Sequence, residues 1–277
     1  MKKERLDSFL TEHGFFSSRE QAKKSILAGL VRIDNVPHTK AGEQIDLDLN
    51  PDRIFIKGQL CPYVSRGGFK LEKGLRVFDF PTEGLVFADV GASTGGFTDC
   101  LLQNGAARVY SIDVGYGQLD WKLRSDDRVV NLERTNFRNL EPGVIPEQVD
   151  GSVMDVSFIS ITKLLPKLRE IMKPGAPGIW LIKPQFEAGR EKVGKHGVVR
   201  DPAVHREVLE KTTAAVQQAG FTVIGLDRSP IKGPSGNIEF LCRVENTPCE
   251  NPADFSDRIR EIADPGYTEP VPEEEGR

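Results

Sequence analysis

The chain has 277 residues, of which 38% are hydrophobic and 28% charged, and its net charge is −4. This length favours two domains, and the absence of a long apolar run argues against a transmembrane helix. The charged N-terminus, MKKERLDSFL, lacks the apolar core of a secretion signal, so a cytoplasmic protein is expected. Four scattered cysteines without a CxxC pair predict no disulfide framework, and four histidines without ligand spacing predict no metal site.

The charge is unevenly distributed along the chain. Residues 245–277 are rich in proline and carry a net charge of −7, which leaves +3 on the preceding residues. Because so acidic a segment can bury little apolar surface, residues 247–277 are predicted to form a disordered tail. The overall acidity therefore does not exclude a nucleic-acid partner for the rest of the chain.

The first 60 residues show the apolar spacing of two short helices, over 4–12 and 18–28, followed by a strand over 30–34. The second helix would share one outward face among Arg19, Lys23 and Lys24. Charge alone favours an ordinary solvated helix face, because residues 1–60 hold ten basic and nine acidic residues. The motif positions are more specific, and they are Arg5-Leu6-Asp7, Ser18-Arg19, Ala22, Ile26, Gly29 and Val31.

These positions resemble the S4 RNA-binding domain over its full length. The resemblance implies a small α+β domain over residues 1–60 that binds structured RNA through phosphate contacts. Asp34, an acid near the usual contact loop, departs from the pattern. Residues 61–69, with Pro62 and a glycine pair, are predicted to be an interdomain linker that leads into a helix over 68–78.

From residue 70 to 246 the pattern alternates between strands and helices, which predicts a largely parallel α/β sheet. Strands are expected over 85–90, 107–113, 128–133, 150–157, 178–183, 220–227 and 237–244, and helices over 158–172 and 202–219. Four charged residues fall at the carboxyl ends of strands, where open α/β sheets bind ligands, namely Asp89, Asp113, Asp155 and Lys183. The polar, basic segment between 184 and 201 is long enough for an active-site loop.

The stretch FADVGASTGGF, residues 87–97, is a strand that ends in a glycine-rich turn and opens a helix, as nucleotide cradles do. The dinucleotide pattern G-x-G-x-x-G has Ser93 at its middle position, which favours a ligand without a pyrophosphate, such as S-adenosylmethionine. Asp113, 22 positions after Gly91, suits a ribose, and Asp89 suits a cationic ligand. The turn also fits the G-x-S-x-G elbow of hydrolases, and a turn without any ligand remains an alternative.

The stretch from Ser65 to Val244 resembles the FtsJ-like ribose 2′-O-methyltransferases, which carry a Lys-Asp-Lys-Glu set. Here these residues are Lys70 in SRGGFKL, Asp155 in VMDVS, Lys183 in LIKPQFE and Glu239 in GNIEF. With an S4 domain in front, the chain resembles the TlyA family of rRNA methyltransferases, some of which are called haemolysins. The resemblance implies a Rossmann-like, seven-stranded, mostly parallel fold that transfers methyl from S-adenosylmethionine to a ribosomal RNA 2′-hydroxyl, with cytidine as the expected nucleotide.

The resemblance also implies which residues act. Lys183 would be central with Asp155 as its positioning partner, and Lys70 could supply a second cation. Asp155 and Glu239 would then orient the two lysines. The donor site would comprise Asp89, Gly91, Ser93, Gly95, Gly96, Phe97, Asp113 and Asn136, the last standing where relatives often carry an acid. RNA would contact Arg5, Arg19, Lys23, Lys24, Arg66, Arg190, Lys192 and Lys195.

Other functions remain open at this stage. A non-catalytic RNA-binding or ribosome-assembly factor would keep the fold and lose turnover. A haemolysin would need a membrane-active segment, and no transmembrane span or amphipathic membrane helix is evident. S4 domains also precede pseudouridine synthases, whose catalytic aspartate motif is not found here.

Overall fold

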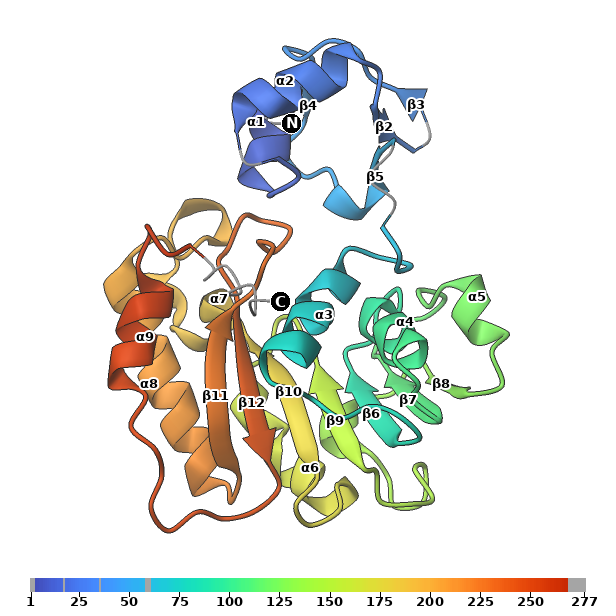
Figure 1. The fold of residues 1–277 in the computed structure, drawn as a ribbon, viewed down its shortest axis with the longest axis vertical. Coiled ribbons are helices and arrows are strands. Elements are labelled where there is room, and N and C mark those ends of the chain that lie inside the picture. The colour runs from blue at the N-terminus through green and yellow to red at the C-terminus, as the bar shows by residue number, and fades with distance from the viewer. Residues whose placement is uncertain (1–2, 17, 35, 58–60, 269–277) are drawn as a thin grey trace, which may run out of the picture.

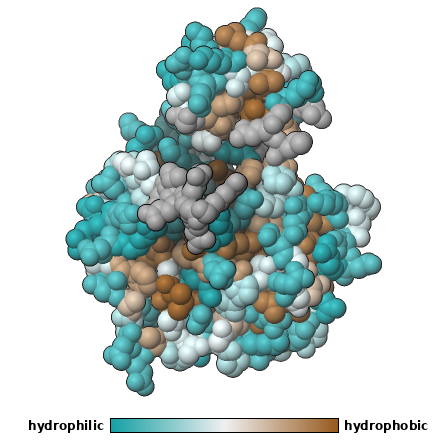
Figure 2. All heavy atoms as spheres, viewed as in Figure 1, coloured by the Kyte–Doolittle hydropathy of each residue, from teal (hydrophilic) through white to brown (hydrophobic). Residues whose placement is uncertain are grey.

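The computed structural model describes residues 3–16, 18–34, 36–57 and 61–268. Figure 1 shows a small N-terminal domain placed above a larger α/β domain, with helix α3 (Gly67–Val77) directly below the small domain. Hydrophilic side chains cover most of the visible surface, and hydrophobic ones gather on the larger domain below this junction (Figure 2).

The small domain packs two helices against two small sheets. Helices α1 (Leu6–Glu12) and α2 (Arg19–Leu27) bury Leu6, Phe9 and Ile26 completely. Strand β1 (Lys3–Arg5) pairs antiparallel with β4 (Gln44–Asp46), and β2 (Val31–Ile33) lies between β3 (Val36–Pro37) and β5 (Ile54–Ile56). The two predicted helices are confirmed, whereas the short strands at both ends were too brief to leave a period-two pattern.

The larger domain is built on a seven-stranded, mostly parallel sheet, as the family resemblance implies, and its strand order is β11-β12-β10-β9-β6-β7-β8. Only β12 runs against its neighbours, because both of its pairings are antiparallel while the β10-β9-β6-β7-β8 pairings are parallel. The strands are β6 (Val86–Val90), β7 (Arg108–Ile112), β8 (Val129–Leu132), β9 (Gly151–Met154), β10 (Pro177–Ile182), β11 (Thr222–Arg228) and β12 (Phe240–Glu245).

Alternate residues of each strand supply two separate cores, one on each face of the sheet. Phe87, Val109 and Val153 contribute to one core, together with side chains of α3 and α4 (Gly96–Gln103). Their neighbours Ala88, Tyr110 and Met154 contribute to the other. That second core is completed by α6 (Leu165–Ile171), α8 (Pro202–Gln218) and α9 (Ser256–Ala263), and the shorter helices are α5 (Trp121–Arg124) and α7 (Pro184–Glu187).

Two sequence predictions need correction. The helix expected over 158–172 begins only at Leu165, because Phe158 has a left-handed backbone (φ 65°) and Pro166 stands in the first turn. The segment 247–277 is not a disordered tail throughout, because α9 buries Ile259, Ile262 and Ala263. These three residues have helical spacing, which the many acids around them obscured. Residues 269–277 lie outside the described residues.

The predicted linker 61–69 is largely part of the larger domain. Tyr63 is buried in one of its cores, and α3 begins at Gly67. Residues 58–60 lie outside the described residues. Just before α3, Arg66 donates a hydrogen bond to the carbonyl of His13 in the small domain, at 2.8 Å. The two domains are therefore joined by a direct polar contact as well as by the chain.

Candidate active site

The carboxyl edge of the sheet brings the predicted catalytic residues together. Asp155 follows β9, and Lys183 follows β10. Glu239 directly precedes β12, and because β12 is antiparallel its start lies at the same edge. The pairing of Ile182 with Phe240 makes Lys183 and Glu239 neighbours across two strands. Lys70 lies in the first turn of α3.

The four side chains form an alternating chain of charges. Lys70 Nζ donates to Glu239 Oε2 at 2.7 Å and to Asp155 Oδ2 at 3.2 Å. On the other side, Lys183 Nζ lies 2.5 Å from Asp155 Oδ1. The side chains of Lys70 and Lys183 are each only 7% exposed, and that of Glu239 is 1% exposed. Asp155 thus holds both lysines at once, at the centre of a buried cluster.

The surroundings separate the roles of the two lysines. Burial alone would lower the pKa of Lys70, but the carboxylates of Asp155 and Glu239 more than offset this and raise it. Burial likewise raises the pKa of Asp155, but the ammonium groups of Lys183 and Lys70 prevail and lower it to about 2. Lys70 is therefore a fixed cation. Lys183 contacts one carboxylate of the set, whereas Lys70 contacts two.

Ser157 is a residue that the sequence reasoning missed. Its hydroxyl accepts a hydrogen bond from Lys183 Nζ at 3.1 Å. It lies two positions after Asp155, in the same motif, so the motif itself was the available signal. We infer that Ser157 helps to hold Lys183 in place.

Two adjoining cavities meet at this cluster. One, of about 160 Å³, is lined by Lys70, Asp155 and Lys183, and also by Pro51 of the small domain. The other, of about 360 Å³, is lined by Asp113, Asn136 and apolar side chains such as Ile112 and Phe137. Gly91, Ser93, Asp155 and Ser157 line both cavities. A donor in the larger cavity would therefore border the lysines across a shared wall.

The larger cavity fits S-adenosylmethionine. Asp113 accepts hydrogen bonds from the backbone N–H groups of Ser93 and Gly115, at 2.8 and 2.7 Å, which holds its carboxylate at the cavity. The apolar wall suits an adenine ring, and Asn136 adds an amide at the same place. At Gly91 (φ 84°) a Cβ atom would stand 2.8 Å from the carbonyl oxygen of Asp155, so glycine is required where the two cavities meet.

The remaining predicted donor residues have different surroundings. At Gly95, which has a left-handed backbone, a Cβ would collide with Leu123, and at Gly96 it would collide with Ser65. These two glycines therefore permit close packing around the start of α4. Gly96 and Phe97 also line the smaller cavity.

Asp89 lies behind the glycine turn and is fully buried. Its Oδ2 accepts a hydrogen bond from the Thr98 hydroxyl at 2.7 Å, while its Oδ1 has no hydrogen-bond partner among the described residues. Burial raises the pKa of this carboxyl to about 7. Asp89 is not among the residues that line either cavity, so its contact with a cationic donor stays a prediction.

The raised pKa of Asp89 predicts a pH-dependent stability. Between the ordinary carboxyl range and about pH 7, the folded protein keeps a proton that the unfolded chain has lost, so stability falls as pH rises through this interval. Each pH unit would cost about 1.4 kcal/mol at most. Urea unfolding of Asp89→Asn between pH 4.5 and 8 should lack this decline. Asp126→Asn, at a carboxylate paired with Arg128, is the control and should keep it. Parallel wild-type and Asp89→Asn curves would contradict the assignment.

The predicted RNA-binding residues are partly neutralised by acids. Asp7, which is buried, accepts hydrogen bonds from both Arg5 and Arg19. Lys24 pairs with Glu20. Lys192 lies 2.5 Å from Glu207, whereas Arg190, Lys195 and Lys23 are exposed. Two arginines on one carboxylate still leave a net positive charge.

The basic loop after α7 is anchored beside the site by Asn237, another residue that the sequence reasoning missed. Asn237 is 2% exposed. Its Oδ1 accepts from the Val199 N–H at 3.0 Å, and its Nδ2 donates to the Gly197 carbonyl at 2.9 Å. Within the described ranges, no group of three or more Asp, Glu, His or Cys side chains could hold a metal ion.

Comparison with known proteins agrees with this geometry. Residues 63–245 match the family model of the FtsJ-like methyltransferases, and residues 4–48 match the S4 domain. "Putative rRNA methyltransferase YqxC" of Bacillus subtilis is 51% identical over 88% of this chain and 86% of that protein. "16S/23S rRNA (cytidine-2'-O)-methyltransferase TlyA" of Mycobacterium tuberculosis is 43% identical over 87% of this chain and 89% of that protein.

A solved structure adds support at the level of the whole chain. The "putative hemolysin" from Streptococcus thermophilus is 47% identical, covers 95% of each chain and superposes with a TM-score of 0.77. The FtsJ-like match alone spans more than half of the 277 residues. The chain therefore belongs to the FtsJ-like methyltransferases, in the TlyA family that adds an S4 domain, and it is an S-adenosylmethionine-dependent enzyme.

Proposed function

We propose that this enzyme methylates a ribose 2′-hydroxyl of ribosomal RNA, at a cytidine. The observation that carries the proposal is the buried Lys70–Asp155–Lys183 arrangement beside the donor cavity. A ribose hydroxyl is a poor nucleophile, and a cation beside it stabilises the negative charge that develops as its proton leaves. The choice of ribosomal RNA and cytidine is supported by the names of the relatives and by the S4 domain.

Bound S-adenosylmethionine supplies an electrophilic methyl group. The residues of the chain position the reacting groups. Lys183 lines the catalytic cavity and would contact the 2′-oxygen, while Asp155 and Ser157, on the wall shared with the donor cavity, hold it there. Lys70 keeps Asp155 and Glu239 in position from the other side. When bound, the donor would supply the methyl group that the 2′-oxygen accepts and would keep the sulfur as a neutral thioether, while the hydroxyl proton would leave to solvent. Holding the reacting atoms in line provides much of the remaining acceleration.

The family resemblance also includes proteins called haemolysins. Across the part of the chain that the structure describes, no helix combines the length and apolar character needed to cross a membrane.

The proposal predicts a specific product. Methyl transfer from labelled S-adenosylmethionine should be measured on 16S and 23S rRNA, on isolated subunits and on assembled ribosomes, followed by nuclease digestion to locate the label. We expect the label on a 2′-O-methylated cytidine. A label on a base would keep the fold and refute the proposed chemistry. Donor binding without transfer to any of these substrates would instead indicate an RNA-binding or assembly factor.

A further inference from the structure

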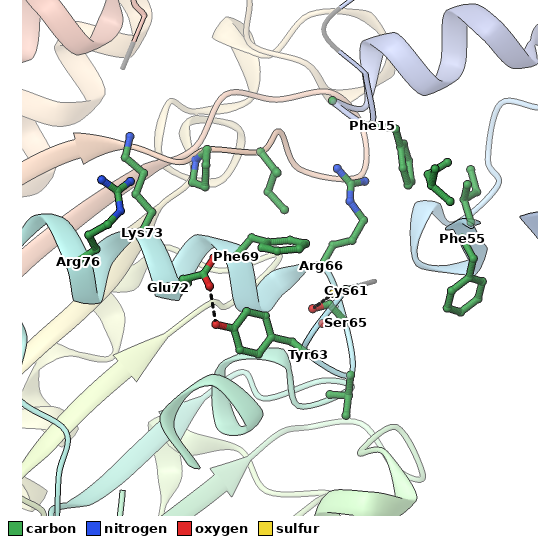
Figure 3. Close-up of a pocket in the computed structure, with 16 residues that line it drawn as sticks. Phe15, Phe55, Cys61, Tyr63, Ser65, Arg66, Phe69, Glu72, Lys73 and Arg76 are labelled. Carbon is green, nitrogen blue, oxygen red and sulfur yellow. Dashed lines mark hydrogen bonds between the residues drawn. The ribbon is translucent and has the colours of Figure 1, made fainter. Parts of the chain in front are cut away.

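A cavity of about 500 Å³ lies between the two domains, outside the donor and catalytic cavities. Figure 3 shows that Phe15 and Phe55 approach it from the small domain, while Phe69 and Arg76 reach it from α3. Its volume falls within the range of sites that bind small organic groups. No part of the proposed reaction uses it.

The walls of this cavity suit a flat aromatic group. The Arg66 guanidinium carbon lies 3.8 Å from the centre of the Phe15 ring. On the α3 side, Phe69 packs edge-on against Tyr63, with 5.8 Å between their ring centres. Phe15 and Phe69 are both half-buried, so each ring keeps some exposed surface. Nucleic-acid bases stack on aromatic rings and on arginine planes of this kind.

The charge of the cavity suits a phosphate backbone. The basic residues that line it are Arg66, Lys73 and Arg76, and the only acid in the lining is Glu72. Lys73 is buried and pairs with Asp227 at 3.4 Å, so the positive charge offered to a ligand comes from the two arginines. Glu72 also accepts a hydrogen bond from the Tyr63 hydroxyl at 2.9 Å. Positive charge around apolar walls favours a nucleic acid, which is a polyanion with flat bases, over an apolar peptide without acidic residues.

The cavity adjoins the catalytic one. Ser65, Arg66 and Ile231 line both. Phe69, Lys73 and Arg76 share one face of α3 because they have helical spacing, whereas Lys70 is directed to the catalytic cluster. The two cavities therefore lie on different sides of α3. An RNA strand that enters one cavity can reach the other cavity within a few nucleotides.

We propose that this interdomain cavity binds an unstacked base of the ribosomal RNA strand that flanks the methylated nucleotide. The base stacks on Phe69 and on the Phe15–Arg66 pair, and this contact sets which sequence or loop can place its ribose at Lys183. The inference rests on the proposed function, because it assumes that the substrate is RNA.

The test uses variants that keep an apolar side chain and remove the ring. In Phe69→Leu and Phe15→Leu, the KM for the rRNA substrate should rise about ten-fold, while kcat and S-adenosylmethionine affinity change less than about two-fold. Phe69→Tyr should restore the wild-type KM. Trp121→Leu, at a 78% exposed ring that does not line this cavity, is the matched control. An unchanged KM in both leucine variants would overturn the inference.

Ultraviolet crosslinking of the wild-type enzyme to the same rRNA provides a second measurement that needs no variant. We expect a crosslinked nucleotide close to the methylated one, on a peptide that contains Phe15 or Phe69. Crosslinks confined to other peptides would refute the proposal. Binding of a partner protein in this cavity in place of RNA would also refute it. Wild-type methylation is measured first on each substrate. Its absence would count against the proposed function, whereas normal methylation with unaffected leucine variants would count against this inference alone.

Discussion

Replacing Lys183 with alanine is expected to lower kcat for methyl transfer by about 10³-fold and to leave S-adenosylmethionine binding intact. Lys183 lines the catalytic cavity, with its Nζ held by Asp155 and Ser157, which line both cavities. Removing a preorganised group that stabilises developing charge costs about 10²–10³ in rate, and loss of orientation adds to this. Lys183 does not line the donor cavity, so donor affinity should be preserved.

Single-turnover transfer of labelled methyl groups and calorimetric titration of the donor would separate these two effects. Lys173→Ala is the matched control, because Lys173 also pairs with an aspartate, Asp150, but follows α6, away from the catalytic cluster. The control should retain wild-type turnover. If Lys183→Ala retained near-normal turnover, Lys183 would not be the central residue, and Lys70 would be the remaining candidate.

The catalytic cluster could be predicted from the sequence because its members sit in short motifs at strand ends. Asp155 and Lys183 follow buried apolar runs, and the carboxyl ends of parallel strands share one edge. Glu239 was harder to place, because it belongs to the edge only if β12 runs in the opposite direction. The motif supplied that residue, and the topology now explains its position.

The order of contacts within the cluster could not be predicted. Sequence spacing does not show that Asp155 bridges both lysines, or that Lys70 receives two carboxylates. The same limit applies to Arg66, which was predicted to bind RNA from its charge. It donates to the His13 carbonyl and lies over Phe15, so it also joins the domains. Such contacts depend on how separate elements pack, which local patterns do not encode.

The small domain contributes residues to both the catalytic cavity and the interdomain cavity. Pro51 of that domain lines the catalytic cavity, and Phe15 lines the interdomain cavity. An RNA bound by the S4 domain would thus be delivered to the catalytic edge by a surface that both domains build. The S4 domain is therefore expected to affect where methylation occurs as well as how tightly RNA binds.

Replacing Lys70 with methionine should cost about 3–5 kcal/mol of folding free energy, because it leaves the buried Glu239 carboxylate without its cation. Glu239 Oε1 already lacks a hydrogen-bond partner among the described residues, so no second donor compensates the loss. Adding Glu239→Gln to Lys70→Met removes the orphaned charge. The double variant should therefore recover much of the stability while remaining inactive, since Asp155 has lost one of its two cations.

Urea unfolding of the wild type, both single variants and the double variant gives the coupling free energy between the two side chains. The surface pair Lys173–Asp150, in which Lys173 is 52% exposed, provides a matched cycle with Lys173→Met and Asp150→Asn, whose coupling should stay below about 1 kcal/mol. Additive effects at Lys70 and Glu239 would show that the two charges are not coupled. A stable but inactive double variant would show that the Lys70–Glu239 pair serves both the fold and the reaction, because the stability would be restored while the activity stays lost.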